Sequence, residues 1–256
     1  MGNYFQKSFR PDIIDGDVSK VIQSDKTDAP FANGDILFDW HPVDIPLGTN
    51  AIADILVHMF GEDGGTQGTH DLHLLIAKSN NGAAPTTLGE ENAAVTGCFE
   101  LQDILIGAIK IEGQADTGSI STGFGRAWYY VYGKSGGPIV IQPEDNNLGG
   151  QSTNRIYVAG IAGGAFDFST GVLKDGAESS DAATSLTTKT VDPRKCFRPG
   201  DTVYIHDVDT AIGTIASMTA TNITLNAAIA GGTDIADEDE FMNATPIKIT
   251  LGFTGR

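Results

Sequence analysis

The stretch IKITLGF, residues 247–253, decides the fold class of this chain. Apolar residues occupy every second position of it, namely Ile247, Ile249, Leu251 and Phe253. Such alternation gives a β-strand one apolar face, whereas an amphipathic helix needs apolar residues three and four apart. The stretch therefore predicts a strand with one face against a hydrophobic core.

The same alternation recurs upstream of this strand. It is seen at 36–40, at 72–76 and in the aromatic run around Trp128, and further apolar runs at 51–60, 101–112 and 155–161 are also strand candidates. The 32 glycines gather in short clusters between these runs, as turns do in all-β proteins. We expect about eight strands before residue 170, in a jelly-roll-like β-sandwich.

Composition changes near residue 174 and indicates a second unit. Residues 177–190 are rich in Ser, Ala, Thr and Asp, which is typical of a linker or exposed loop. Beyond it, a turn at 197–201, a strand at 202–206 and a hairpin of 211–218 with 222–225 fit a small SH3-like β-barrel or meander. Because the strand at 247–253 can return to the sandwich, we expect residues 182–243 to be inserted into a main domain of 35–181 plus 244–256.

Residues 1–34 are polar, broken by proline and glycine, and predict an extended N-terminal arm. Its aromatic residues are candidate anchors for an interface with another protein: Phe5, Phe9 and Phe31. Such an arm either packs on its own domain or reaches to a neighbour, and the sequence leaves both alternatives open.

The chain is acidic, with a net charge of −17 and a pI of about 4.4. This charge disfavours contact with nucleic acid and with anionic lipid. No apolar stretch is long enough to span a bilayer and the N-terminus has no apolar signal region, so we expect synthesis in the cytoplasm without a signal peptide. Cys98 and Cys196 lie far apart and predict two free thiols, with a single disulfide between them as the alternative.

Sequence motifs for catalysis and cofactors are missing. The chain has no P-loop, no GxSxG, no HExxH and no EF-hand loop, and no GxGxxG that opens a helix after a strand. His70 and His73 are three apart on an expected strand, where they point to opposite faces and do not converge on zinc. We therefore expect a protein that is not an enzyme.

One pair of carboxylates, Asp207 and Asp209, lies in an expected tight loop. Carboxylate oxygens two residues apart can share a calcium ion, so these residues are the candidate metal site; solvation of a charged loop is the alternative. A glycoside hydrolase would need two acids across a cleft beside an aromatic platform such as Trp128. Alternating aromatics on a strand are more typical of core packing.

Three segments resemble virion structural proteins of tailed phages, especially phages of marine cyanobacteria. They are FDWHPVDIPLGTNAI (38–52), RIYVAGIAGGAFDFSTGV (155–172) and VDPRKCFRPGDTVYIHDVDTAIGTI (191–215). The resemblance implies a capsid decoration or cementing component, or a part of the neck or tail. It carries no catalytic residues over to this chain.

Two functions from different classes follow. The first is a non-enzymatic virion protein that acts through protein–protein interfaces, with the major capsid protein or other virion proteins as partners and with itself as a homo-oligomer. Repeated contacts of modest strength suit this role because copies on one particle bind with avidity. The second is a carbohydrate-binding or host-adhesion β-sandwich, with or without calcium.

Overall fold

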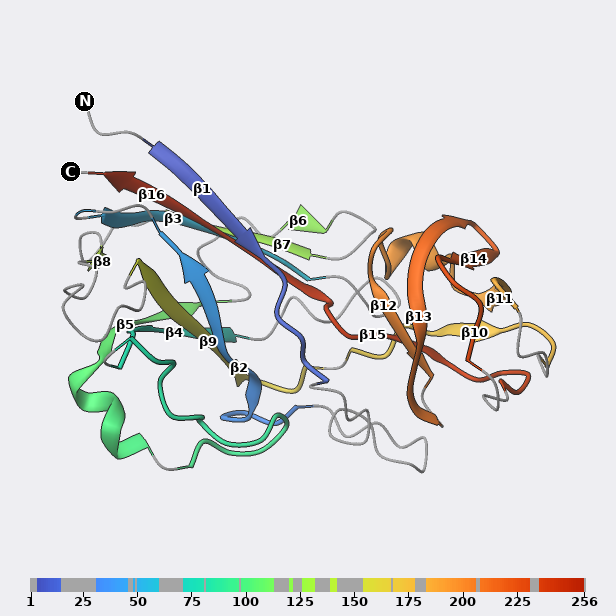
Figure 1. Ribbon diagram of the computed structural model, residues 1–256, viewed down its shortest axis with the longest axis horizontal. Helices are drawn as coiled ribbons and strands as arrows, with labels where there is room; N and C mark the ends of the chain where they lie inside the picture. The colour runs from blue at the N-terminus through green and yellow to red at the C-terminus, as the bar shows by residue number, and fades with distance from the viewer. Residues whose placement is uncertain are drawn as a thin grey trace.

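The computed structural model is all-β, which confirms the expected fold class. The described residues form sixteen strands and two short 3-10 helices, η3 (Cys98–Asp103) and η4 (Pro193–Lys195). Figure 1 shows the strands divided between a larger lobe, which contains β1 and β16, and a smaller lobe. The structure describes residues 4–14, 31–45, 48, 50–59, 71–80, 82–96, 98–112, 120–121, 126–131, 139–141, 154–166, 168–177, 183–205, 208–230 and 235–255, of which 98–100, 120–121, 126–131 and 208–210 are described by their backbone alone.

The first sheet of the larger lobe has the strand order β1-β16-β3-β7-β6, and β8 also pairs with β3. Every pairing in it is antiparallel. Its strands are β1 (Tyr4–Phe9), β3 (Asn50–Met59), β6 (Ile120–Ser121), β7 (Arg126–Val131), β8 (Ile139–Ile141) and β16 (Ile247–Gly255).

The second sheet of the larger lobe has the order β2-β9-β4-β5 and is also antiparallel. Its strands are β2 (Ile36–Asp44), β4 (Asp71–Lys78), β5 (Leu105–Ile111) and β9 (Arg155–Gly163).

Four strand pairs of the larger lobe are nested in the sequence. β4 pairs with β5, β3 with β7, β2 with β9, and β1 with β16, so each pair encloses the one before it. Two further pairings, β3 with β16 and β4 with β9, join the nested pairs into the two sheets. The larger lobe therefore has the topology of one long antiparallel hairpin that is folded over into two sheets. In the sequence, the smaller lobe is inserted between β9 and β16.

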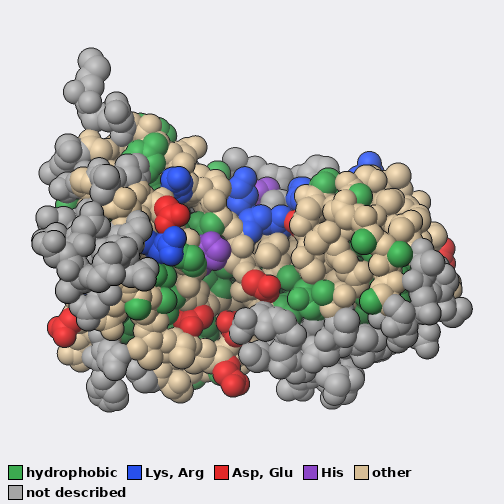
Figure 2. Space-filling view, in the orientation of Figure 1, with side chains coloured by type: hydrophobic (Ala, Val, Ile, Leu, Met, Phe, Trp, Pro, Cys, Tyr) green, Lys and Arg blue, Asp and Glu red, His purple; other side chains and the backbone are tan. Residues whose placement is uncertain are grey.

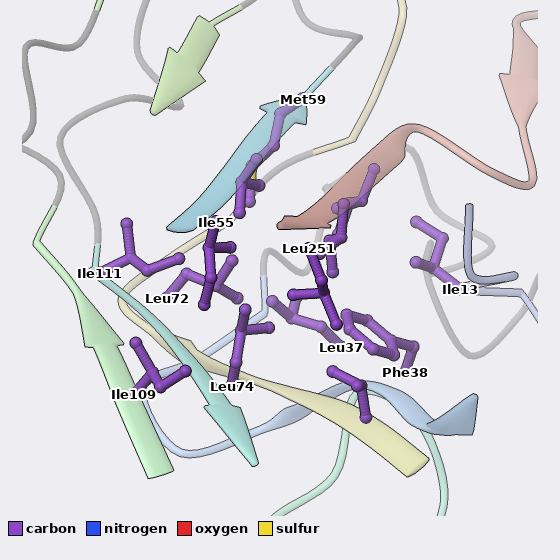
Figure 3. Close-up of a cluster of buried hydrophobic side chains, with 14 of the residues drawn as sticks. Ile13, Leu37, Phe38, Ile55, Met59, Leu72, Leu74, Ile109, Ile111 and Leu251 are labelled. Atoms are coloured by element: carbon purple, nitrogen blue, oxygen red, sulfur yellow. The ribbon is translucent and has the colours of Figure 1, made fainter. Parts of the chain in front are cut away.

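The main core lies between the two sheets of the larger lobe. Figure 3 shows Ile55 and Leu251 of the first sheet pointing toward Leu72 and Leu74 of the second. All four of these side chains are at most 2% exposed. Full burial of such a side chain contributes about 1.5–3 kcal/mol, so the alternation in β16 is a main source of cohesion between the sheets.

Two glycines allow close approach inside this lobe. A Cβ atom on Gly160 of β9 would collide with the ring of Phe38 on β2, and one on Gly252 of β16 would lie 2.6 Å from Oδ2 of Asp54 on β3. A side chain at either position would force a packed neighbour to move, so these two positions require glycine.

The smaller lobe is a six-stranded sheet with the order β10-β11-β14-β13-β12-β15. A bridge between Leu173 and Glu240 joins its two ends, and its own apolar cluster includes Leu186, Phe197 and Phe241, each fully buried. Its strands are β10 (Val172–Lys174), β11 (Ser185–Thr190), β12 (Thr202–Ile205), β13 (Val208–Thr219), β14 (Asn222–Leu225) and β15 (Phe241–Asn243).

Sequence and structure differ at the entrance to this lobe. The expected linker at 177–190 was wrong for its last part, because residues 185–190 form β11. Leu186 and Thr188 of that strand are buried, with a threonine taking the place of an apolar residue. The lobe also includes β10, which precedes the expected start of the unit at residue 182. The expected hairpin of 211–218 with 222–225 is confirmed by the pairing of β13 with β14.

The N-terminal arm packs on its own chain wherever it is described. Residues 4–9 form β1 at the edge of the first sheet, and Ile13, Ile14 and Phe31 are at most 1% exposed within the main core. Residues 15–30 lie outside the described part of the chain.

Candidate functional site: a basic junction between the lobes

A buried carboxylate, Asp201, marks the place where the two lobes meet. It ends the turn 197–201, in which Gly200 has a φ of +93° that favours glycine. Its side chain is 2% exposed and forms an ion pair with Arg10, whose Nη2 donates to Oδ2 at 3.1 Å. The backbone N–H of Arg198 and Nδ2 of Asn243 also donate to Oδ2, at 2.8 and 3.0 Å. The carboxylate is thus fully engaged.

Asn243 extends this network to the segment that returns the chain to the larger lobe. Its Nδ2 donates to the carbonyl oxygen of Cys196 at 2.8 Å, and its Oδ1 accepts from the N–H of Thr245 at 2.9 Å. Nε of Arg10 donates to the carbonyl of Thr245 at 3.0 Å. The end of β1, the turn before β12 and the link from β15 to β16 are therefore held in one hydrogen-bonded unit.

Cations gather around this unit, although the chain as a whole is acidic. Lys248 of β16 lies opposite His58 of β3 in the sheet register, and Figure 2 shows Lys and Arg side chains and a histidine together between the lobes. Burial lowers the pKa of His58, and the positive charges of Arg198, Lys248 and Arg10 lower it further. These three cations and the imidazole of His58 therefore belong to one group of side chains.

A shallow cavity of about 420 Å³ opens beside these cations on the smaller lobe. Arg194 and Arg198 line it together with the apolar side chains of Phe197, Pro199 and Met218. Nη2 of Arg194 pairs with Asp192 at 2.6 Å, and Nη1 of Arg198 donates to the carbonyl of Arg194 at 2.5 Å. Burial lowers the pKa of Arg198, partly opposed by Asp201.

We call this surface the basic junction and define it by five residues: Arg10, His58, Arg194, Arg198 and Lys248. Within the described residues, ion pairs join Arg10 to Asp201 and Arg194 to Asp192, so the four Lys and Arg side chains of the junction stand beside two carboxylates on a chain of net charge −17. Cations beside an apolar floor can bind a carboxylate or another anion, because partial removal of water strengthens each charge–charge contact.

The expected metal site falls outside what the structure describes. Asp207 lies outside the described residues, and Asp209 lies in β13, of which only the backbone is described at that position. In the described part of the chain, no three His, Cys, Asp or Glu side chains lie together as ligands for a metal ion. Calcium binding at Asp207 and Asp209 stays a prediction.

The three expected interface aromatics all contact their own chain. Phe5 stacks on Phe253 at 5.0 Å between ring centroids, and Phe9 stacks on His41 at 4.6 Å. Phe31 is 1% exposed and meets Phe168 edge to face at 5.6 Å. These contacts match the alternative in which the arm packs on its own domain, and a further contact with another protein stays a prediction.

Sequence reasoning missed the basic junction. Its residues come from 10, 58, 194–198 and 248, and no short motif joins them. The one local signal was the run PRKCFRPGD at 193–201, which places three cations beside a predicted turn in a chain that has only 16 Lys and Arg.

No family model matches the sequence, and no curated protein matches it. No helix in the described residues has the length and apolar character of a membrane span.

Proposed function

We propose that this protein is a non-enzymatic structural component of a tailed-phage particle, a capsid decoration or cementing protein that acts through protein–protein interfaces. The observation that carries the proposal is the nesting of β4·β5 inside β3·β7, β2·β9 and β1·β16. Nested antiparallel pairs that alternate between two facing sheets are the pattern of a jelly roll, an architecture common among viral capsid and lectin domains. The step from fold to virion is a fold-level analogy, supported by the resemblance of three sequence segments.

The smaller lobe belongs to the same proposal as an SH3-like barrel inserted before the last strand of the jelly roll. Support comes from its strand order and from the bridge between Leu173 and Glu240, which brings the first and last strands of its sheet together. Closure removes the exposed edges through which a small sheet otherwise aggregates. Such a lobe adds a second surface for contact with neighbours on a particle.

The second candidate is a carbohydrate-binding or host-adhesion module. Jelly rolls also occur as lectin domains, so the same strand order supports it. Asp207 and Asp209 would then be ligands of a calcium ion, and this ion would bind the sugar.

Light scattering of the purified protein with and without calcium separates the two candidates. A structural component with self-complementary surfaces forms an oligomer whose mass calcium leaves unchanged. A monomer whose shape responds to calcium, together with a change in Trp128 fluorescence on adding sugars, would favour the lectin-like module. In that case Asp207→Asn would abolish both responses.

A further inference from the structure

We propose that the basic junction is the docking surface for an acidic turn, residues 235–240, of a second copy of this chain. The inference rests on the proposed function, because it names one of the protein–protein interfaces through which that function would work. The partner is another copy of the chain, and carboxylates are the groups that the junction recognises.

The acidic turn presents two carboxylates outward and keeps two inward. Oδ2 of Asp239 accepts from the N–H of Ala236 at 2.6 Å, and Oε1 of Glu240 accepts from the N–H of Thr170, also at 2.6 Å. The side chains of Asp237 and Glu238 are 53% and 67% exposed. Oδ1 of Asp237 also accepts from the N–H of Gly176 at 2.8 Å, so this carboxylate and that of Glu238 are held at the surface, where a partner can reach them.

Lys189 pairs with both exposed carboxylates of the turn but neutralises only one of their two negative charges. Its Nζ lies 2.7 Å from Asp237 and 3.5 Å from Glu238, so one cation is shared between two carboxylates. Hydrogen bonding to Lys189 lowers the pKa of Asp237, which keeps this carboxylate ionised down to acidic pH. Exposed ion pairs of this kind are weak and exchange readily with a partner's charges.

The two surfaces cannot neutralise each other within one molecule. Figure 1 places the red segment before β15 on the side of the smaller lobe that faces away from the larger lobe, whereas the basic junction lies between the lobes. A contact between them must join two copies. Because the two surfaces differ, the contact is heterologous and closes into a ring or extends as a filament.

The net charge of the chain does not forbid this contact. Charges are screened over about 8 Å at physiological ionic strength, so a docked segment responds mainly to the local cations. Lys248 is exposed on the outer face of β16, and Arg194 and Arg198 stand beside an apolar floor. A short acidic turn can lie against this group, whereas the remaining acidic surface repels a long polyanion such as nucleic acid.

The test is the association constant of the purified full-length protein, measured by sedimentation equilibrium at fixed ionic strength. Lys248→Glu and Glu238→Lys each place like charges in contact, and each should weaken self-association by about tenfold or more. The double variant restores opposite charges and should recover most of the loss. Equal association of both single variants and the wild type, or a wild type that stays monomeric, would overturn the proposal.

Two matched control variants distinguish the effect of losing this contact from the effect of net charge on self-association. Lys7→Glu alters an exposed lysine on β1, whose side chain alternates to the opposite face of the first sheet from Lys248. Glu90→Lys alters an exposed glutamate of the larger lobe. Both controls change the net charge as the test variants do, and both should associate like the wild type.

Glu238→Gly tests the same contact without a charge reversal in the turn. Glu238 has a φ of +73°, where glycine is favoured, so the variant removes the carboxylate without straining the turn. It should fold at least as stably as the wild type and still associate more weakly. If all these variants associate like the wild type while the protein is found on particles, this inference fails and the proposed function stands.

Discussion

Arg10 and Asp201 form an ion pair across the junction of the two lobes, although 191 positions separate them in the sequence. The side chain of Asp201 is 2% exposed and that of Arg10 is 24% exposed. Arg10 also donates to the carbonyl of Thr245 in the link between the lobes. One side chain thus joins the N-terminal strand to both the smaller lobe and the returning chain.

Replacing Arg10 with leucine should therefore destabilise the protein by about 2–3 kcal/mol, because a buried carboxylate loses its cation. The backbone N–H of Arg198 and the amide of Asn243 remain bonded to Asp201, which keeps the loss at the lower end for a buried pair. Urea unfolding followed by circular dichroism measures the free energy of unfolding.

Arg155→Leu is the matched control, since it breaks an exposed pair. Nε of Arg155 lies 2.8 Å from Asp44, and both side chains are more than 40% exposed. Its loss should cost less than about 1 kcal/mol. Equal effects of the two substitutions would contradict the structural role assigned to Arg10.

Gly160→Ala should destabilise the larger lobe by about 1–3 kcal/mol, because the new methyl group collides with the rigid ring of Phe38. Gly107→Ala is the control: its Cβ would lie 2.6 Å from Cδ1 of Ile139, the end of a flexible side chain that can move. Thermal unfolding compares them. A Tm for Gly160→Ala equal to that of the control would show that β2 and β9 do not pack as described.

Phe5→Ala should cost about 2 kcal/mol, because it removes a partly buried ring that stacks on Phe253. Gln6→Ala, at the exposed neighbouring position, should change stability by less than about 0.5 kcal/mol. Unfolding in urea reports both values. A Phe5→Ala protein as stable as the wild type would mean that this part of the arm is free to reach another molecule.

The lowered pKa of His58 makes stability depend on pH in a defined direction. Between the ordinary histidine pKa of 6.5 and the lower value in the folded protein, the unfolded chain binds a proton that the folded chain does not. The contribution of His58 is therefore fully present above pH 6.5 and is lost as the pH falls through that window.

Unfolding of wild type and His58→Gln, compared from pH 7.5 to 5, isolates this contribution. Burial also lowers the pKa of His41, so some acid destabilisation should persist in the variant. The variant should lose less stability on acidification than the wild type does. If the free energy of unfolding fell equally with pH in the wild type and the variant, His58 would make no contribution to the pH dependence.

Local alternation predicted the strands well, because it reports which face of a strand is buried. The apolar positions of 247–253 became fully buried residues of β16, and the apolar run at 51–59 became most of β3. β2 is the edge strand of its sheet and has register shifts near Pro42, as a proline inside a strand favours. β11 was missed because one of its two buried positions, Thr188, is not an apolar residue.

The strand pairing and the basic junction could not be predicted in the same way. Which strands pair depends on contacts between distant parts of the chain, such as Phe5 with Phe253. Alternation within one strand does not indicate which other strand it pairs with. The junction forms only when β1, β3, β16 and the turn 197–201 come together. Its charges looked like ordinary surface charges in the sequence, since only the fold brings Arg10 to Asp201.

Fractionation of phage particles measures directly whether the protein is part of a virion. Lysates of a host infected with a tailed phage that encodes this chain would be separated on a density gradient, and antibody labelling would be followed by electron microscopy. We expect the protein to sediment with intact particles and to be labelled at regularly repeated positions. Protein confined to the soluble fraction, with unlabelled particles, would contradict it.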